Sequence, residues 1–206
     1  ANTIAIVTDG SRVLSLGNIG GYAAIPVMEG KALLFKKLAD IDAFPICFEN
    51  YHTEFADEIR NIAPVFGGIA LEDIAAPKCF ELEEALQGIG IPVMHDDQHG
   101  TAVVVLAALL NACRVTKKRF EDLNIVVCGS GAAGFAITRM LMSIGYDPGL
   151  FPPVNDIIVC DSHGLKRYFR GICKSGSLRP CWKSIHTMKL PMTFILFSTT
   201  IRQTVW

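Results

Sequence analysis

Several features are scarce or missing in this sequence, and each absence argues against a class of protein. The seven cysteines form no C-x-x-C pair. An odd count without framework spacing favours reduced thiols over a disulfide scaffold. No signal peptide and no uninterrupted apolar run long enough to span a membrane is present. These absences favour a cytoplasmic or organellar protein with no membrane partner.

Acidic residues are missing from the last part of the chain. Residues 165–206 hold eight of the 19 Lys and Arg residues but none of the 20 Asp and Glu residues. A basic segment can bind nucleic acid or anionic lipid, but these cations are scattered among apolar residues instead of grouped in a run. We therefore expect no nucleic-acid partner. The abrupt change in composition suggests a change of reading frame near residue 164.

What remains is a globular composition in which 50% of the residues are apolar and 19% are charged. Short β-rich runs alternate with helical patterns up to residue 164. This alternation predicts an α/β fold with a parallel sheet covered on both faces. The expected strands are 4–8, 44–48, 65–71, 92–95, 123–128 and 156–160, and the expected helices are 23–39, 54–62, 79–87, 98–112 and 135–144.

A glycine-rich turn separates the strand 123–128 from the helix after it. The turn has the spacing G-x-G-x-x-G and consists of Gly129, Ser130, Gly131, Ala132, Ala133 and Gly134. In such a turn the first glycine permits the bend, the second lets a pyrophosphate approach the backbone, and the third allows close helix packing. Strand, glycines, helix and strand in this order predict a partial Rossmann unit that binds a dinucleotide. A turn that only packs tightly is the alternative.

Asp161 ends the strand that follows this turn and its helix. An acid there can accept hydrogen bonds from the adenosine ribose of a dinucleotide. It favours NAD, because a carboxylate repels the 2′-phosphate of NADP. Lys166 and Arg167 follow closely, so the expected cofactor is NAD or NADP.

Two pairs of acids follow two expected strands of the first sheet. Glu72 and Asp73 follow the strand 65–71, and Asp96 and Asp97 follow the strand 92–95. Ligands of parallel α/β sheets gather at the carboxyl ends of the strands, so the pairs could meet at one cation. Oxygen ligands suit Mg²⁺ or Mn²⁺. The alternative is helix capping, with Asp97 as the cap of the helix that begins at residue 98.

Two cationic side chains could complete such a site. Lys31 lies in an otherwise apolar stretch, and a buried lysine near acids could act as a base. Arg12 follows the first strand, where its planar fork could bind a substrate carboxylate. The alternative for both is an ordinary surface residue, which is the more common case for such a lysine or arginine.

Four segments resemble the malic enzymes, in order and at suitable spacing, over residues 1 to about 164. They are VTDGSRVLSLGNIGGYAAIPVMEGKALLFK, FGGIALEDIAAPKCFELEE, VMHDDQHGTAVVVLAALLNA and VVCGSGAAG. The blocks LEDI and HDDQHGTA are the most specific, and the resemblance is to the shorter, bacterial-type branch.

The resemblance implies an oxidoreductase that converts malate to pyruvate and CO₂ with reduction of NAD or NADP and with Mg²⁺ or Mn²⁺. It implies that Lys31 takes the proton from the malate hydroxyl, that Asp96 hydrogen-bonds Lys31, and that Arg12 binds a malate carboxylate. The implied metal ligands are Glu72, Asp73 and Asp97.

The resemblance also implies three regions: a substrate and metal domain over residues 1–112, a partial NAD(P)-binding Rossmann domain over 113–164, and an unrelated basic tail over 165–206. Family members are homo-oligomers, either dimers or tetramers. The tyrosine that protonates the product in the family lies upstream of the first residue, and from Leu165 onward no match to the family is evident. We therefore expect a chain cut at both ends.

Whether such a chain is active stays open. One alternative is a non-catalytic remnant that binds nucleotide or metal at most. The other is a metal-free dehydrogenase with the same glycine turn, which the paired acids disfavour.

Overall fold

The computed structural model describes residues 2–49, 54–144, 147, 149, 152–161, 164–170 and 194–197 of the chain. These residues form two compact units that divide between Asp97 and Gln98. The division lies earlier than the boundary at residue 112 that the sequence suggests. The reason is that the long helix around the boundary sends its buried side chains into the core of the second unit.

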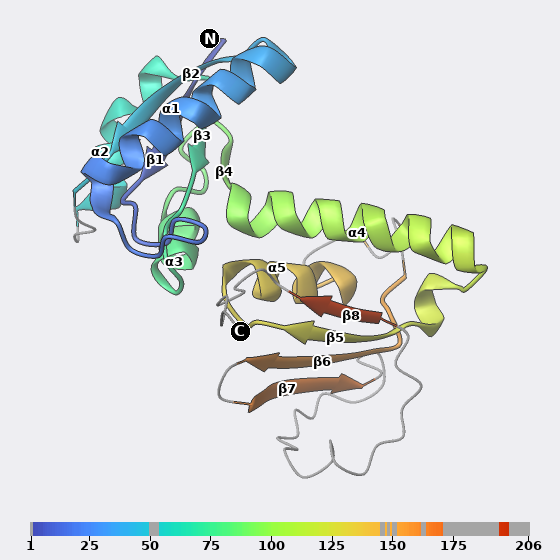
Figure 1. Cartoon of the computed structure of the whole chain (residues 1–206). Coiled ribbons are helices and arrows are strands. Elements are labelled where there is room, and N and C mark those ends of the chain that lie inside the picture. Colours follow the sequence, from blue (N-terminus) through green and yellow to red (C-terminus); the bar gives the residue numbers. More distant parts are fainter. Residues whose placement is uncertain are drawn as a thin grey trace. The chain divides into compact units, whose positions relative to one another are not determined.

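The first unit is built on a four-stranded parallel sheet with the strand order β2-β1-β3-β4 (Figure 1). The strands are β1 (Thr3–Thr8), β2 (Asp42–Cys47), β3 (Gly68–Leu71) and β4 (Val93–His95). The connecting helices are α1 (Gly20–Ala39), α2 (Phe55–Ile62), the 3-10 helix η1 (Ala63–Val65) and α3 (Lys78–Ala85). Because all strands are parallel, their carboxyl ends lie along one edge of the sheet.

The core of this unit surrounds β1. Ala5, Ile6 and Val7 are fully buried, as expected of a central parallel strand with both faces covered. From α2, Phe55 and Ile59 are also fully buried. This core holds the carboxyl ends of β1, β3 and β4 in fixed positions.

The second unit contains α4 (Asp96–Thr116), the 3-10 helix η2 (Phe120–Asp122), β5 (Asn124–Cys128), α5 (Ala132–Leu141) and β6 (Asp156–Asp161). Two further strands, β7 (Gly164–Arg170) and β8 (Phe194–Phe197), complete a sheet with the order β7-β6-β5-β8. Strand β5 is parallel to β6 and β8, whereas β7 runs antiparallel to β6.

The strands β7 and β8 lie beyond 156–160, the last strand that the sequence predicts. Their residues carry no strong periodic signal, and each strand forms by pairing with an existing strand, β6 or β5. Pairing of this kind depends on tertiary context more than on local propensity. The rest of the basic tail lies outside the described residues.

Helix α4 is nearly all apolar in sequence, but only one stripe of it is buried within the described residues. Ala102, Leu109 and Cys113 are buried along one stripe, whereas Val103 and Val104 are 56% and 68% exposed. Among the described residues, α4 is the one helix long and apolar enough to cross a membrane. Core helices of globular proteins meet the same criterion, so the helix is weak evidence for a membrane span.

Candidate functional site

Two acidic pairs lie side by side at the carboxyl edge of the first sheet. Glu72 and Asp73 follow β3 directly, and Asp96 and Asp97 form the first turn of α4 directly after β4. Because β3 and β4 are neighbours, with Leu71 opposite His95, the ends of these strands bring the two pairs together. The convergence expected from the sequence is therefore present.

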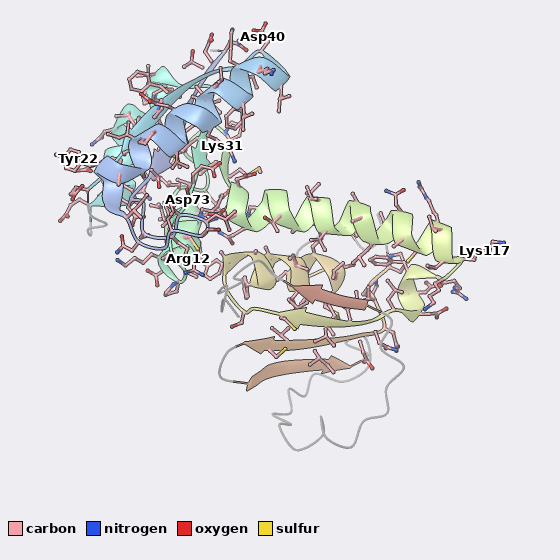
Figure 2. All side chains as sticks on the ribbon, viewed as in Figure 1. Arg12, Tyr22, Lys31, Asp40, Asp73 and Lys117 are labelled. Carbon is pink, nitrogen blue, oxygen red and sulfur yellow. The ribbon has the colours of Figure 1, made fainter. Side chains whose placement is uncertain are left out.

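Lys31, which Figure 2 labels on α1, contacts one acid of each pair. Its Nζ donates a 2.7 Å hydrogen bond to Asp96 Oδ2 and lies 3.1 Å from Glu72 Oε1. The contact with Glu72 is an ion pair without hydrogen-bond geometry, and Glu72 is the more buried of the two acids, with 6% of its side chain exposed against 39% for Asp96. Lys31 is thus not a surface lysine but the cation at the centre of an acidic cluster.

The cluster holds more negative charge than one lysine offsets. Burial raises the pKa of Glu72 to about 8, with Asp96 and Asp97 adding to the rise and Lys31 opposing it. Burial and the neighbouring Asp97 raise the pKa of Asp73 to about 6. Burial likewise raises the pKa of Asp97, although the backbone N–H of Asp73 opposes the shift. The carboxylates are therefore poorly neutralised as they stand.

Lys31 itself is held in its protonated form. Burial works against its charge, but the hydrogen bond to Asp96 and the charge of Glu72 outweigh it and raise the pKa of Lys31 above its usual 10.5. A general base has to be neutral before it takes a proton. In this arrangement Lys31 keeps its proton and cannot act as a base while the two carboxylates stabilise its charge.

Asp73 and Asp97 are linked through the backbone. The N–H of Asp73 donates a 3.0 Å hydrogen bond to Asp97 Oδ2. Asp73 also has a positive φ of 55°, a conformation that costs energy for a residue other than glycine. Asp97 lies inside the first turn of α4 instead of before it, and the hydrogen bond it accepts comes from the loop after β3. Its role is to join the two acidic pairs, in addition to any favourable effect on the helix dipole.

The loop that carries Arg12 is hydrogen-bonded to the segment of chain that carries Asp73. The N–H of Arg12 donates to the carbonyl of Asp73 at 2.8 Å, and the N–H of Ala75 donates to Ser11 Oγ at 2.9 Å. Ser11 Oγ in turn donates to Asp9 Oδ1 at 2.6 Å. These bonds fix the start of the Arg12 loop beside the acids, while the Arg12 side chain itself is exposed (Figure 2).

The sequence did not single out Asp9, Ser11 or His95 as part of the site. The run Asp9-Gly10-Ser11 after a buried strand is typical of a turn closed by an aspartate side chain, and that signal could have found it. His95 is fully buried, and its Nε2 lies 3.7 Å from Asp97 Oδ2. A lone histidine ending a short strand gives no comparable signal.

The acids fit a divalent cation in chemistry but are not assembled around one. Glu72 Oε1 is a buried oxygen that accepts no hydrogen bond, and three neighbouring carboxylates have raised pKa values. Hard oxygen donors of this kind suit Mg²⁺ or Mn²⁺. Within the described residues, however, no three potential ligands already lie in metal-binding geometry.

The glycine-rich turn lies in the second unit, between β5 and α5. Gly129 has a φ of 118°, which favours glycine, and the N–H of Gly129 donates to the carbonyl of Cys160 at 2.7 Å. A side chain at Gly134 would meet the Gly129 carbonyl at 1.8 Å, whereas a side chain at Gly131 would meet nothing within 4 Å. The third glycine is thus required for packing, and the second borders open space.

The remaining residues of the turn lie at its surface or at the start of α5, and the expected ribose acid ends the neighbouring strand. Ser130 is exposed, and Ala132 and Ala133 are the first two residues of α5, so their backbone N–H groups belong to the helix start. Asp161 is the last residue of β6, next to Cys160, which pairs with the residue before Gly129. The side chain of Asp161 lies outside the described part of the chain, as do those of Lys166 and Arg167.

Comparison with known families gives two matches along the chain. Residues 1–55 match the family described as malic enzyme, N-terminal domain, and residues 98–170 match malic enzyme, NAD binding domain. The second match begins at Gln98, the first residue of the second unit, and continues through β7, further than the resemblance seen in the sequence.

Individual proteins similar to this chain are also malic enzymes. The chain is 55% identical over 165 residues to the NAD-dependent malic enzyme of Geobacillus stearothermophilus, covering 79% of this chain and 33% of that protein. It is 40% identical over 190 residues to the NADP-dependent malic enzyme of Rhizobium meliloti, covering 91% of this chain and 24% of that protein. Coverage of 91% cannot fit within residues 1–164, so this similarity extends into the basic tail.

A solved structure shows the same similarity in three dimensions. The NAD-dependent malic enzyme of Thermotoga maritima superimposes with a TM-score of 0.73 and 50% sequence identity, covering 80% of this chain and 42% of that chain. The chain spans about a third or less of the length of the two curated relatives above.

Proposed function

The chain belongs to the malic enzyme family, whose relatives are NAD- and NADP-dependent, and we propose that it oxidatively decarboxylates malate to pyruvate and CO₂. The proposed hydride acceptor is NAD or NADP, bound at the glycine-rich turn. The proposed metal is Mg²⁺ or Mn²⁺, with Glu72, Asp73 and Asp97 as its ligands.

The observation that carries the proposal is the cluster of Lys31 with the two acidic pairs. A lysine within 3.1 Å of Glu72 and 2.7 Å of Asp96 offers a proton acceptor beside a set of oxygen ligands. Oxidation of a 2-hydroxy acid needs a proton acceptor, because the hydroxyl proton has to leave as the hydride leaves the carbon that bears it, and oxygen ligands would hold a cation that favours this loss. Burial and the neighbouring carboxylates raise the pKa values of Glu72 and Asp73, so a cation at these oxygens would offset unfavourable negative charge, which supports the proposal.

Each residue then has a definite task. Lys31 Nζ receives the hydroxyl proton, and Asp96 keeps Lys31 in position through their hydrogen bond. The Arg12 guanidinium, from the loop bonded to Asp73, binds a carboxylate of malate. A divalent cation on the acids would bind the hydroxyl and its neighbouring carboxylate of malate and lower the pKa of the hydroxyl.

Lys31 can act as a base only if its pKa falls. Its raised pKa comes partly from the negative charge of Glu72, so Lys31 loses its proton more readily once Glu72 is neutralised by another partner. Glu72 is therefore proposed both to contribute a ligand oxygen and to control the protonation of Lys31.

The test is malate-dependent reduction of NAD⁺ and of NADP⁺ by the purified chain with Mn²⁺, repeated with EDTA. The proposal predicts reduction that depends on both malate and Mn²⁺. Reduction that continues unchanged in EDTA would remove the metal from the proposal. An absence of reduction by a chain shown to be folded by circular dichroism would remove the activity.

A second function, binding of nucleotide without turnover, is favoured by two observations. Lys31 is held protonated, and the described acids do not yet lie in metal-binding geometry. Calorimetric binding of NAD⁺ without malate-dependent reduction, at the same Mn²⁺ concentration, would select this second function.

We also propose a homo-oligomer, either a dimer or a tetramer, and a cytoplasmic location. The first two residues of α4 belong to the acidic cluster, so its N-terminal end serves the site and is not free to enter a membrane. Sedimentation of the purified chain tests the oligomer, and recovery in the soluble or the membrane fraction tests the location.

A further inference from the structure

Two cysteines lie opposite each other on the neighbouring strands β5 and β6, and one of them, Cys128, directly precedes the glycine-rich turn. Cys128 is the last residue of β5 and Cys160 lies next to the end of β6, and the two are direct partners in the parallel register of these strands. Their sulfur atoms are 3.6 Å apart. The strands are adjacent in the middle of the second sheet (Figure 1).

The geometry is suitable for a bond between the two sulfurs. Neighbouring strands are separated by about 4.8 Å, which lies within the range of about 4.4 to 6.8 Å seen between the Cα atoms of disulfide-bonded cysteines. Paired residues project to the same side of a sheet, and the contact between the sulfurs agrees with this. Side-chain rotation and a small approach of the strands suffice for the sulfurs to reach bonding distance.

The pair is also more accessible than the neighbouring core. Val127 and Val159, one residue earlier in each strand, are buried in the core between the sheet and its helices. Because side chains alternate along a strand, Cys128 and Cys160 project to the opposite face, and both are only partly buried. A small oxidant can therefore reach them without opening the core.

We propose that Cys128 and Cys160 form a reversible disulfide that weakens dinucleotide binding at the neighbouring turn, an inference that rests on the proposed nucleotide site. Hydrogen peroxide is the oxidant class. One thiolate attacks the peroxide to give a sulfenic acid and hydroxide, and the second thiolate attacks that sulfur and releases hydroxide as the S–S bond forms. Overall, two thiols and one H₂O₂ give one disulfide and two waters, and a dithiol reductant reverses the reaction by exchange.

The effect on binding follows from the position of the two residues. Gly129, which follows Cys128, donates its N–H to the carbonyl of Cys160, and Asp161, the expected ribose acid, follows Cys160. Drawing the two sulfurs together shifts both strand ends relative to the turn. The backbone N–H groups and the ribose acid then no longer fit one dinucleotide as well as they do in the dithiol form.

The experiment compares the purified full chain before and after stoichiometric H₂O₂, with and without later dithiothreitol. Peptide mass mapping is expected to show residues 128 and 160 in linked peptides, and NAD⁺ titration is expected to show binding weakened about tenfold or more and restored by dithiothreitol. Cys128→Ser and Cys160→Ala should each abolish the linked peptide and the redox effect. Cys47→Ser, which changes a partly buried cysteine of the first unit, is the matched control and should keep both.

Three results would overturn the inference. One is the absence of the linked peptide after peroxide treatment, and another is equal NAD⁺ affinity of the linked and reduced forms. The third is an undiminished redox effect in both the Cys128→Ser and the Cys160→Ala variants. If the reduced chain binds neither NAD⁺ nor NADP⁺, the proposed nucleotide site fails, while the linked peptide still decides whether the disulfide forms.

Discussion

Lys31 on α1 donates a 2.7 Å hydrogen bond to Asp96 at the start of α4, although 65 positions separate them in the sequence. The bond joins the helix after β1 to the residue after β4, so it forms only when the parallel sheet of the first unit is complete. It is one of the two contacts that keep Lys31 protonated.

Asp96→Asn is expected to lower the pKa of Lys31. The amide can still accept a hydrogen bond, but it carries no charge, and burial of the ammonium is then opposed mainly by Glu72. Titration of the Lys31 side chain by carbon-13 NMR measures the change. An unaltered Lys31 pKa in the variant would show that the contact with Asp96 is not formed in solution.

Lys31→Ala is expected to reduce malate-dependent NAD(P)H formation about a hundredfold or more, because removal of a general base typically costs this much. Binding of the dinucleotide should not change. Lys36→Ala is the matched control, since Lys36 lies on the same helix and pairs with Asp40 and Asp42 at the surface. A comparable loss of NAD(P)H formation in both variants would mean that any disturbance of α1 lowers activity, and that Lys31 has no specific role.

Without divalent cations, stability is expected to fall as the pH rises from about 4.5 to 8. Glu72 has a folded-state pKa of about 8 against an ordinary value of 4.5, so in this range the folded chain retains a proton that the unfolded chain has lost. The free energy of unfolding then falls by up to about 1.4 kcal/mol per pH unit. Asp73, with its pKa raised to about 6, acts in the same direction below that pH.

Urea unfolding at several pH values measures this slope. Glu72→Gln should flatten it, because the amide does not titrate, while Glu84→Gln on the exposed face of α3 should leave it unchanged. A Glu72→Gln variant with the same slope as the original chain would place the responsible group elsewhere.

Two glycine variants are expected to separate packing from binding in the glycine-rich turn. Gly134→Ala places a methyl group against the Gly129 carbonyl, and this overpacking should cost about 1 to 3 kcal/mol of stability. Gly131→Ala meets nothing within 4 Å and keeps an ordinary backbone conformation, with φ of −74°. It should therefore preserve stability but weaken NAD⁺ binding about tenfold or more, because the methyl group enters the space expected for the pyrophosphate.

Thermal unfolding and NAD⁺ titration of the two variants provide the measurement. If Gly131→Ala binds NAD⁺ as tightly as the original chain does, the turn only packs tightly and does not hold a phosphate.

The sequence predicted much of the fold because the relevant signals are local. The strand that contains Ala5 and Val7 is a short apolar run bounded by a turn, and the turn at Gly129 has a fixed spacing of glycines. The order of these elements then implies a parallel sheet. Strands β7 and β8 were missed because they depend on pairing with β6 and β5 and not on their own pattern.

The proximity of the two acidic pairs was predictable from the sequence, but the contacts that Lys31 makes with them were not. Acids at the carboxyl ends of neighbouring parallel strands can converge, and this rule predicted that the pair Glu72 and Asp73 could meet the pair Asp96 and Asp97. No rule fixes how α1 is rotated, so the position of Lys31 between them could not be derived from spacing. The same holds for the pairing of Cys128 with Cys160, which depends on the register of two strands separated by a long connection.

The most direct test of the acidic cluster as a cation site is calorimetric titration of Mn²⁺ into the purified chain at neutral pH, with Glu72→Gln and Glu84→Gln in parallel. The original chain and Glu84→Gln are expected to bind Mn²⁺, whereas Glu72→Gln is expected to lose this binding, because Glu72 is the most buried of the proposed ligands. Equal Mn²⁺ binding by all three would rule out Glu72 as a ligand of the cation.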